Sequence, residues 1–92
     1  MKIFTGALLV AMTVSAPAFA KDRAPTRAER VAIEKKLHSL GYTSWDEIKL
    51  DDDRPYHRPK WEIDDARKGK GPRFDIDLEP QTLRVIQTER DD

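Results

Sequence analysis

Residues 73–90 read RFDIDLEPQTLRVIQTER and carry the clearest structural signal in the chain. In the first half of this stretch apolar residues alternate with acidic ones, which is the period of a strand with one face on a core and the other in water. Residues 79–82 interrupt the alternation, because Pro80 has a fixed φ and no amide hydrogen to donate to a neighbouring strand. Apolar residues then resume, so the stretch predicts two antiparallel strands joined by a turn. The apolar positions are Phe74, Ile76, Leu78, Leu83, Val85 and Ile86.

Two shorter alternating segments precede this hairpin, and each predicts one further strand. The positions expected to face the core are Ile48 and Leu50 in residues 45–50, and Trp61 and Ile63 in residues 61–64. The polar connection between the two segments contains two prolines, which do not suit the inside of a sheet. The second strand is expected to fade near Ala66, and a loop with two glycines, residues 67–72, leads into the hairpin.

A helix is predicted to begin after Thr26. Thr26 and Glu29 have the spacing of a capping box, in which the hydroxyl accepts from one backbone amide and the carboxylate from another. Ile33, Leu37 and Leu40 share one helical face, and Gly41 follows where a left-handed residue often ends a helix. Val31 lies off this face, so either the helix packs on two sides or Val31 is exposed. The predicted fold class is α+β, with one N-terminal helix packed on a four-stranded antiparallel sheet.

The first twenty residues have the parts of a secretory signal peptide. Lys2 precedes an apolar run, and the run ends at the small-residue pattern Ala18-Phe19-Ala20. The run is too short for a membrane span, which needs about 20 apolar residues. We therefore expect a cleaved signal peptide over 1–20, a flexible N-terminus over 21–25 and one domain over 26–90. The protein is expected to be periplasmic or secreted, with no stable membrane anchor.

Composition excludes several classes of partner and chemistry. The chain has 92 residues, a formal net charge of 0 and no cysteine, so it has no disulfide and no thiolate. Cleavage after Ala20 would remove a single charged residue, Lys2, and leave a formal charge of −1. A nucleic-acid partner is not expected, because nucleic-acid-binding domains usually carry a clear basic excess. A domain this small has a limited core, so packing against a second copy in a homodimer is one way to gain stability.

No catalytic, cofactor-binding or metal-binding residue is assigned from the sequence. Ser39 and His38 are adjacent on a helix, where neighbouring side chains point in different directions. Asp51, Asp52 and Asp53 run consecutively toward His57, without the alternating acidic positions and central glycine of a calcium loop. Such a run is typical of a solvated turn. We expect a protein that is not an enzyme and has no cofactor.

Two groups of residues are the candidates for a partner-binding surface. Trp45 and Tyr56 lie off the core pattern, and aromatic residues are enriched at the centres of interfaces. Arg67, Lys68, Lys70 and Arg73 form a basic patch around the glycine-bearing loop, which could attract anionic lipid headgroups, a polyanion or an acidic partner surface. The competing interpretations are a satellite aromatic cluster and an ordinary hairpin tip.

The sequence resembles the PepSY domain family over residues 26–90. The resemblance rests on the helix ending in Leu40-Gly41-Tyr42, the strand Lys60-Trp61-Glu62-Ile63-Asp64, the stretch Arg73-Phe74-Asp75-Ile76-Asp77-Leu78 and the following Pro-x-Thr turn. The family turn usually reads acidic-Pro-x-Thr-Gly, whereas this chain has Leu83 in place of the glycine. A left-handed conformation at that position is costly for leucine.

The resemblance implies a small α+β module of the kind found in protease propeptides and in small secreted or periplasmic proteins, without catalytic residues of its own. Our leading hypothesis is an exported module that binds a protein partner and regulates or inhibits a peptidase or another envelope protein. An extended peptide could add to an open sheet edge. One alternative is a sensor for a small ligand or cation, using residues 51–53 and the polar face that carries Asp75 and Asp77. The other is a self-associating structural protein.

Overall fold

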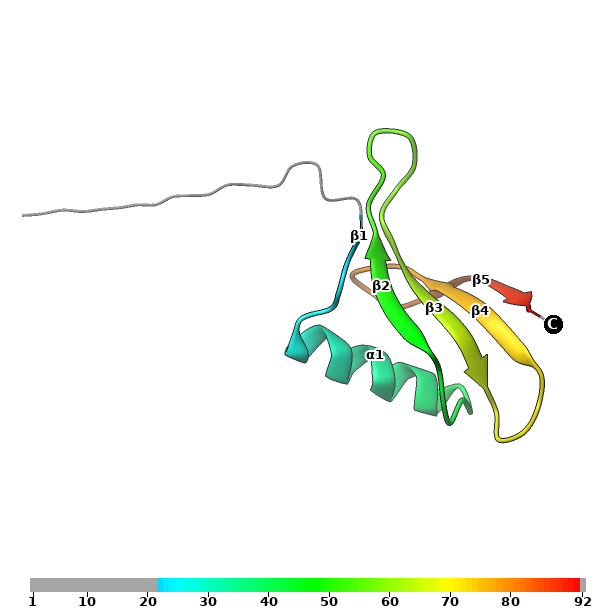
Figure 1. The fold of residues 1–92 in the computed structure, drawn as a ribbon. Coiled ribbons are helices and arrows are strands. Elements are labelled where there is room, and N and C mark those ends of the chain that lie inside the picture. Colours follow the sequence, from blue (N-terminus) through cyan, green and yellow to red (C-terminus); the bar gives the residue numbers. More distant parts are fainter. Residues whose placement is uncertain (1–21, 92) are drawn as a thin grey trace, which may run out of the picture.

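The computed structural model describes residues 22–91, and the predicted signal peptide lies outside these residues. One helix and five strands follow one another along the chain (Figure 1). They are β1 (Asp22–Arg23), α1 (Arg27–Ser39), β2 (Glu47–Asp51), β3 (Lys60–Arg67), β4 (Arg73–Leu78) and β5 (Val85–Arg90). The predicted α+β class, with one helix and an antiparallel sheet, is confirmed.

The sheet has five strands where the sequence predicted four. All five pair in chain order and antiparallel, so β1 and β5 form its two edges. The additional strand, β1, lies within the segment expected to be flexible and pairs Arg23 with Leu50. It is held because the Arg23 guanidinium lies 2.9 Å from the Glu29 carboxylate and 5.5 Å from the centre of the Trp61 ring.

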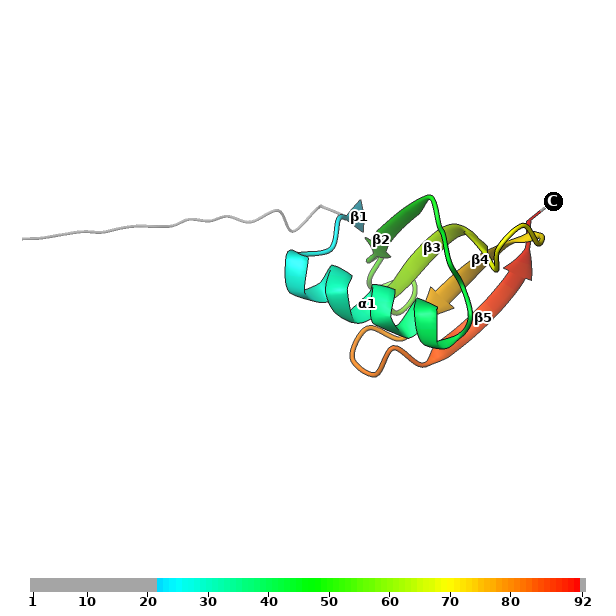
Figure 2. The same cartoon turned by 90° about the horizontal axis from the view of Figure 1, so that it is seen from below.

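The helix α1 packs across one face of the sheet (Figure 2). The predicted capping box is present: the Glu29 amide donates to the Thr26 hydroxyl at 3.2 Å, and the Thr26 amide donates to the Glu29 carboxylate at 2.8 Å. Ile33 and Leu37 are fully buried, while Val31 is 59% exposed, so the helix packs on one side only. The buried core joins this helical face to the inward positions of the strands, namely Ile48, Trp61, Ile63, Ala66, Ile76 and Leu78.

The strand β3 ends at Arg67, close to Ala66 where it was expected to fade, and a bulge interrupts its alternation before that end. The register with β4 shifts between Ile63 and Ala66, and Asp65 between them has a φ of 55°. The extra residue restores the inward orientation, so that both Ile63 and Ala66 are buried. The Asp65 amide donates to the Asp75 carboxylate at 3.2 Å.

The turn between β4 and β5 is organised by one carboxylate. Glu79 accepts from the amides of Gln81 and Thr82, at 2.9 and 2.7 Å, and from the Thr82 hydroxyl at 3.0 Å. These bonds explain the acidic-Pro-x-Thr pattern, because the acid and the threonine close the turn. Leu83, which follows, has a φ of 61°, so it adopts the left-handed conformation that the family pattern assigns to glycine.

Candidate functional site

The sheet face opposite α1 is not covered by any helix among the described residues, and it is strongly acidic. Eight carboxylates, two lysines and two arginines project from it, and we call this set the acidic face. Its members follow from the strand register and the burial pattern. They are Asp22, Glu47, Lys49, Asp51, Lys60, Glu62, Asp64, Arg67, Arg73, Asp75, Asp77 and Glu89.

The register places like charges directly opposite one another on this face. Glu47 pairs with Asp64, Glu62 pairs with Asp77, and Asp75 pairs with Glu89. Like charges in directly opposite positions destabilise a sheet. The two lysines offset part of this repulsion: Lys60 Nζ lies 3.1 Å from the Asp77 carboxylate, and Lys49 Nζ lies 3.9 Å from the Glu62 carboxylate. The acidic face therefore has repulsion that its own cations do not remove.

Two of these carboxyl groups have raised pKa values, first because of burial and then because of neighbouring carboxylates. Burial raises the pKa of Glu62, and the neighbouring Asp51 and Asp77 carboxylates raise it further against the effect of the lysines. Burial also raises the pKa of Asp64, with Lys49 opposing and Asp75 contributing in the same direction. An open depression of about 310 Å³ lies on this part of the face, lined by residues of β3, β4 and β5. A cationic group placed there would oppose the repulsive contribution to the raised pKa values of Glu62 and Asp64.

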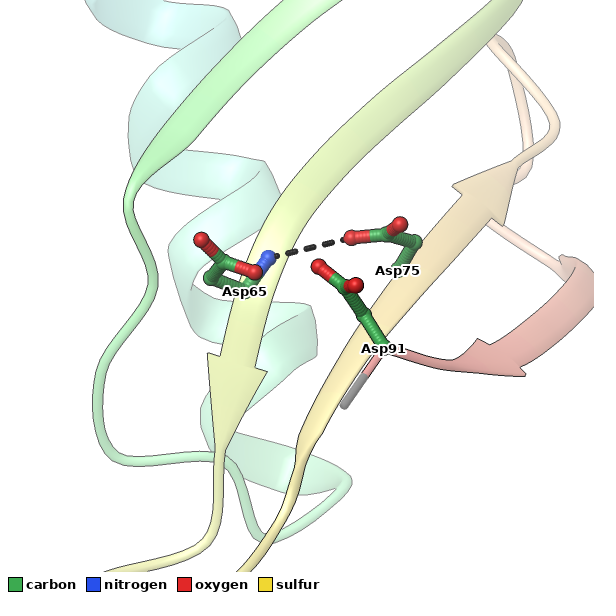
Figure 3. A group of neighbouring side chains, drawn as sticks. All are labelled: Asp65, Asp75 and Asp91. Carbon is green, nitrogen blue, oxygen red and sulfur yellow. Dashed lines mark hydrogen bonds between the residues drawn. The ribbon is translucent and has the colours of Figure 1, made fainter.

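Three carboxylates meet at one end of the acidic face (Figure 3). Asp65, Asp75 and Asp91 each offer an oxygen within 4.8 Å of the others. A hydrogen bond with the Asp65 carboxyl group raises the pKa of Asp91, with the Asp75 carboxylate as the next cause.

The outer edge of β5 is open along its whole length, because no strand among residues 22–91 pairs with it, whereas the two-residue β1 forms the opposite edge. The Asp91 amide donates to the Arg73 carbonyl at 2.8 Å. Antiparallel pairs alternate between hydrogen-bonded and non-hydrogen-bonded, so Glu89 and Gln87 direct their backbone groups at β4. Thr88, between them, directs its amide and carbonyl at the open edge. Its exposed backbone is a template for another strand.

A second depression, of about 280 Å³, adjoins the beginning of β5. Ile86, which is 48% exposed, and Arg84 line it on the β5 side. Residues 57–59 of the connection between β2 and β3, Lys60 at the start of β3, and Glu79 line it on the other side. This depression is suited to receive one side chain of a segment that lies along the edge.

The residues expected to bind a partner lie at two opposite ends of the sheet. Trp45 is half buried, with its ring centre 5.3 Å from that of His38 at the end of α1. Arg67, Lys68 and Lys70 lie at the same end, because Thr43 and Ser44 bond to the backbone of Arg67. Tyr56 is 83% exposed and belongs to the β2–β3 connection at the far end of β2 (Figure 1). One continuous surface does not contain both aromatic residues.

The acidic turn named for the cation-sensor alternative is held by its own neighbours. The Arg54 guanidinium bonds to the Asp52 carboxylate at 2.7 and 2.6 Å, and His57 Nε2 lies 3.6 Å from an Asp53 carboxylate oxygen. Of the acidic residues named in the sequence analysis, Asp75 alone belongs to a close carboxylate cluster in the described part of the chain. Asp65 and Asp91 were missed, because the bulge and the last pairing of β5 have no signature in the alternation.

Comparison with known proteins gives one match. A family model described as "Peptidase propeptide and YPEB domain" matches residues 4–89. No curated protein and no solved structure matches the chain significantly. Within residues 22–91, α1 is neither long nor apolar enough to cross a membrane.

Proposed function

The chain belongs to the peptidase propeptide and YPEB domain family, which confirms the resemblance found in the sequence, and from this membership we propose that it is a non-catalytic, exported binding module. Its partner is a peptidase or another envelope protein, which it regulates or inhibits. Propeptide-type domains act on peptidases by binding. The segment at residues 1–20 and the secreted or periplasmic occurrence implied by the family support an exported location.

The observation that carries this proposal is the open edge of β5. The partner contributes an extended segment that pairs with β5 as a sixth strand, and the backbone groups of Thr88 supply hydrogen bonds. The depression beside Ile86 receives one side chain of that segment. Tyr56 is next in the chain to the residues lining this depression, so it extends the surface there. Trp45, Arg67, Lys68 and Lys70 form a separate contact at the other end of the sheet.

The proposal is tested by blocking the edge without disturbing the fold. In Thr88→Pro the chain loses an amide that points away from β4, so the ladder within the sheet keeps its bonds. We expect this variant to fold and to lose binding to the partner. In Thr88→Ala the side chain changes but the amide remains, so binding is expected to persist. Folding of each variant is checked by circular dichroism and thermal unfolding.

The measurement is peptidase activity in an envelope extract, together with cross-linking to the purified protein. We expect the wild type and Thr88→Ala to cross-link to one protein and to lower its activity, and Thr88→Pro to do neither. A folded Thr88→Pro variant that still binds and inhibits would show that β5 is not the binding edge. Absence of any partner for the wild type would contradict the proposed function itself.

A further inference from the structure

We propose that the bound segment is a cationic strand, with lysine or arginine at every second position facing the acidic face and β-branched or apolar residues between them. This inference rests on the proposed function, because it specifies the chemistry of the segment that pairs with β5. The argument uses three features: the alternation of side chains along an added strand, the charge of the face beside it, and the unrelieved repulsion on that face.

An added strand would continue the two faces of the sheet. Side chains in a strand alternate between faces, and directly opposite residues share a face. Every second residue of the incoming segment therefore projects beside Gln87 and Glu89, on the acidic face. The residues between them project beside Thr88, on the opposite face, where β-branched and apolar side chains fit. The face and the edge together specify an alternating pattern.

The acidic face determines that the charged side chains of the incoming segment are positive. On β4, Asp75 lies opposite Glu89 and Asp77 lies opposite Gln87. The strand next to β5 therefore also carries acidic groups on this face. Neighbouring strands lie about 4.8 Å apart, and long side chains also reach diagonal neighbours. A lysine beside Glu89 is thus placed near an opposed pair of carboxylates, Asp75 and Glu89. A glutamate in the same position would add a further like charge.

The other occupants of the edge are less well matched. A second copy of this chain pairing through β5 would bring two acidic faces side by side, which adds repulsion. An uncharged segment would leave the like-charge pair next to the edge, Asp75 and Glu89, unrelieved. Of these three occupants, only a cationic segment both pairs with β5 and reduces the repulsion between Asp75 and Glu89.

The test uses three synthetic peptides of about seven residues, the length of an ordinary strand. All carry the same valine and threonine residues at one set of alternating positions, and lysine, glutamine or glutamate at the other set. Binding to the protein is measured by calorimetry, and protection of the Thr88 amide by hydrogen exchange in NMR spectra. We expect the lysine peptide to bind at least about tenfold more tightly than the glutamate peptide, with the glutamine peptide between them.

Two charge-reversal variants test whether the preference for the lysine peptide arises beside β5. Glu89→Lys changes the charge beside the proposed strand, while Glu47→Lys makes the same change on β2, three strands away on the same face. We expect Glu89→Lys to lose the preference for the lysine peptide and Glu47→Lys to keep most of it. An equal loss in both variants would show that the overall field of the protein, and not docking beside β5, attracts the peptide.

The outcomes separate this inference from the proposed function. Equal binding of all three peptides with protection of Thr88 would overturn the charge selection and leave strand addition standing. Binding of the lysine peptide without protection of Thr88 would overturn the placement along β5, because the peptide would then lie on the face. If no peptide binds while the envelope partner is still captured through the Thr88 edge, the cationic segment is wrong and the binding module stands.

Discussion

Leu83 occupies a backbone conformation that suits glycine, and it does so beside the core. Its φ is 61°, and a residue with a β-carbon in this region loses about 1–2 kcal/mol relative to the right-handed conformation. Its side chain is half buried and packs against the core cluster. The apolar contact therefore offsets a strained turn, which the Glu79 carboxylate also holds by bonding to the Thr82 amide at 2.7 Å.

Replacement of Leu83 separates the strain from the packing. Leu83→Ala and Leu83→Gly remove nearly the same apolar contact, but only the glycine variant relieves the left-handed strain. In ordinary strand or helix positions glycine is less stable than alanine by about 0.5–1 kcal/mol. Here we expect the reverse order, with Leu83→Gly more stable than Leu83→Ala by about 1 kcal/mol. Urea unfolding of both variants measures the difference, and an alanine variant that is the more stable would show that position 83 is not strained.

The Glu29 carboxylate makes the stability of the fold depend on pH. The Arg23 guanidinium, with the Thr26 amide as the second cause, lowers the pKa of Glu29 to about 2. A carboxyl group whose pKa is lowered by folding stabilises the fold above its unfolded pKa, near 4.5, and this contribution is lost as the pH falls toward 2. We expect Glu29→Gln to reduce stability at pH 7 and to show a smaller further loss over this pH range. Thermal unfolding between pH 7 and pH 2 checks it, and parallel curves for both proteins would count against the role of Glu29.

At the scale of elements, the acidic face lowers the stability of the sheet that carries it. Glu62 lies opposite Asp77, and burial, followed by the Asp51 carboxylate, raises the pKa of Glu62. A raised folded pKa means that the folded state favours the protonated form, so the penalty appears as the pH rises through that pKa. We expect Glu62→Gln to be more stable than the wild type at pH 7 by a few tenths to about 1 kcal/mol, because one like-charge pair is removed.

The pH dependence provides the control for this change. Below the raised pKa, Glu62 is protonated and resembles glutamine, so the stability difference between the two proteins should disappear toward pH 3. A gain that persists unchanged at acidic pH would have another cause, such as better packing of the amide. Asp46→Asn is a matched control, since Asp46 is exposed and lies outside the acidic face. We expect it to leave stability unchanged within about 0.5 kcal/mol.

The two aromatic residues selected from the sequence belong to different elements and should respond differently to truncation. Tyr56 is 83% exposed in the β2–β3 connection, so Tyr56→Ala is expected to change stability by less than about 0.5 kcal/mol. Trp45 packs against the core cluster and His38, so Trp45→Ala is expected to destabilise the domain by about 2 kcal/mol. Chemical denaturation measures both. Equal, small effects would mean that Trp45 is a surface residue.

The elements differ in how far the sequence could predict them. The helix has a period and a capping box, and β2, β3 and β4 alternate, so their local sequence is sufficient. The strand β5 has adjacent apolar residues instead, and only the turn before it indicates a strand there. The strand β1 has only two residues and no period. It is held by the contacts of the Arg23 guanidinium with the Glu29 carboxylate and the Trp61 ring. Alternation shows that Asp75 and Asp77 share a face, but it does not give their cross-strand partners. The bulge at Asp65 and the pairing of Asp75 with Glu89 depend on register, which tertiary contacts decide.

At the scale of the whole molecule, a formal net charge of 0 conceals a separation of charge. Eight carboxylates but only four basic residues project from the acidic face. Basic residues are numerous elsewhere, including Arg27, Arg30, Lys35 and Lys36 on α1 and Lys68 and Lys70 in the β3–β4 loop. Two copies joined edge to edge through β5 would form one continuous sheet with both acidic faces on the same side. Open-edged sheet proteins commonly avoid edge pairing by placing charges there.

We therefore expect the protein to be a monomer at micromolar concentration, which sedimentation velocity measures directly. The salt dependence of association distinguishes electrostatic repulsion between copies from a mere lack of attraction. Salt screens charges, because the screening length falls from about 10 Å at 0.1 M to about 3 Å at 1 M. If the charges on β5 keep copies apart, association should be undetectable at 0.1 M and increase, if at all, at 1 M. Glu89→Lys, which removes the outermost acidic charge of the edge strand, should associate more readily than the wild type or Glu47→Lys. A wild-type dimer that becomes tighter as salt is lowered would show attraction between copies, and the second copy would then be the occupant of the β5 edge.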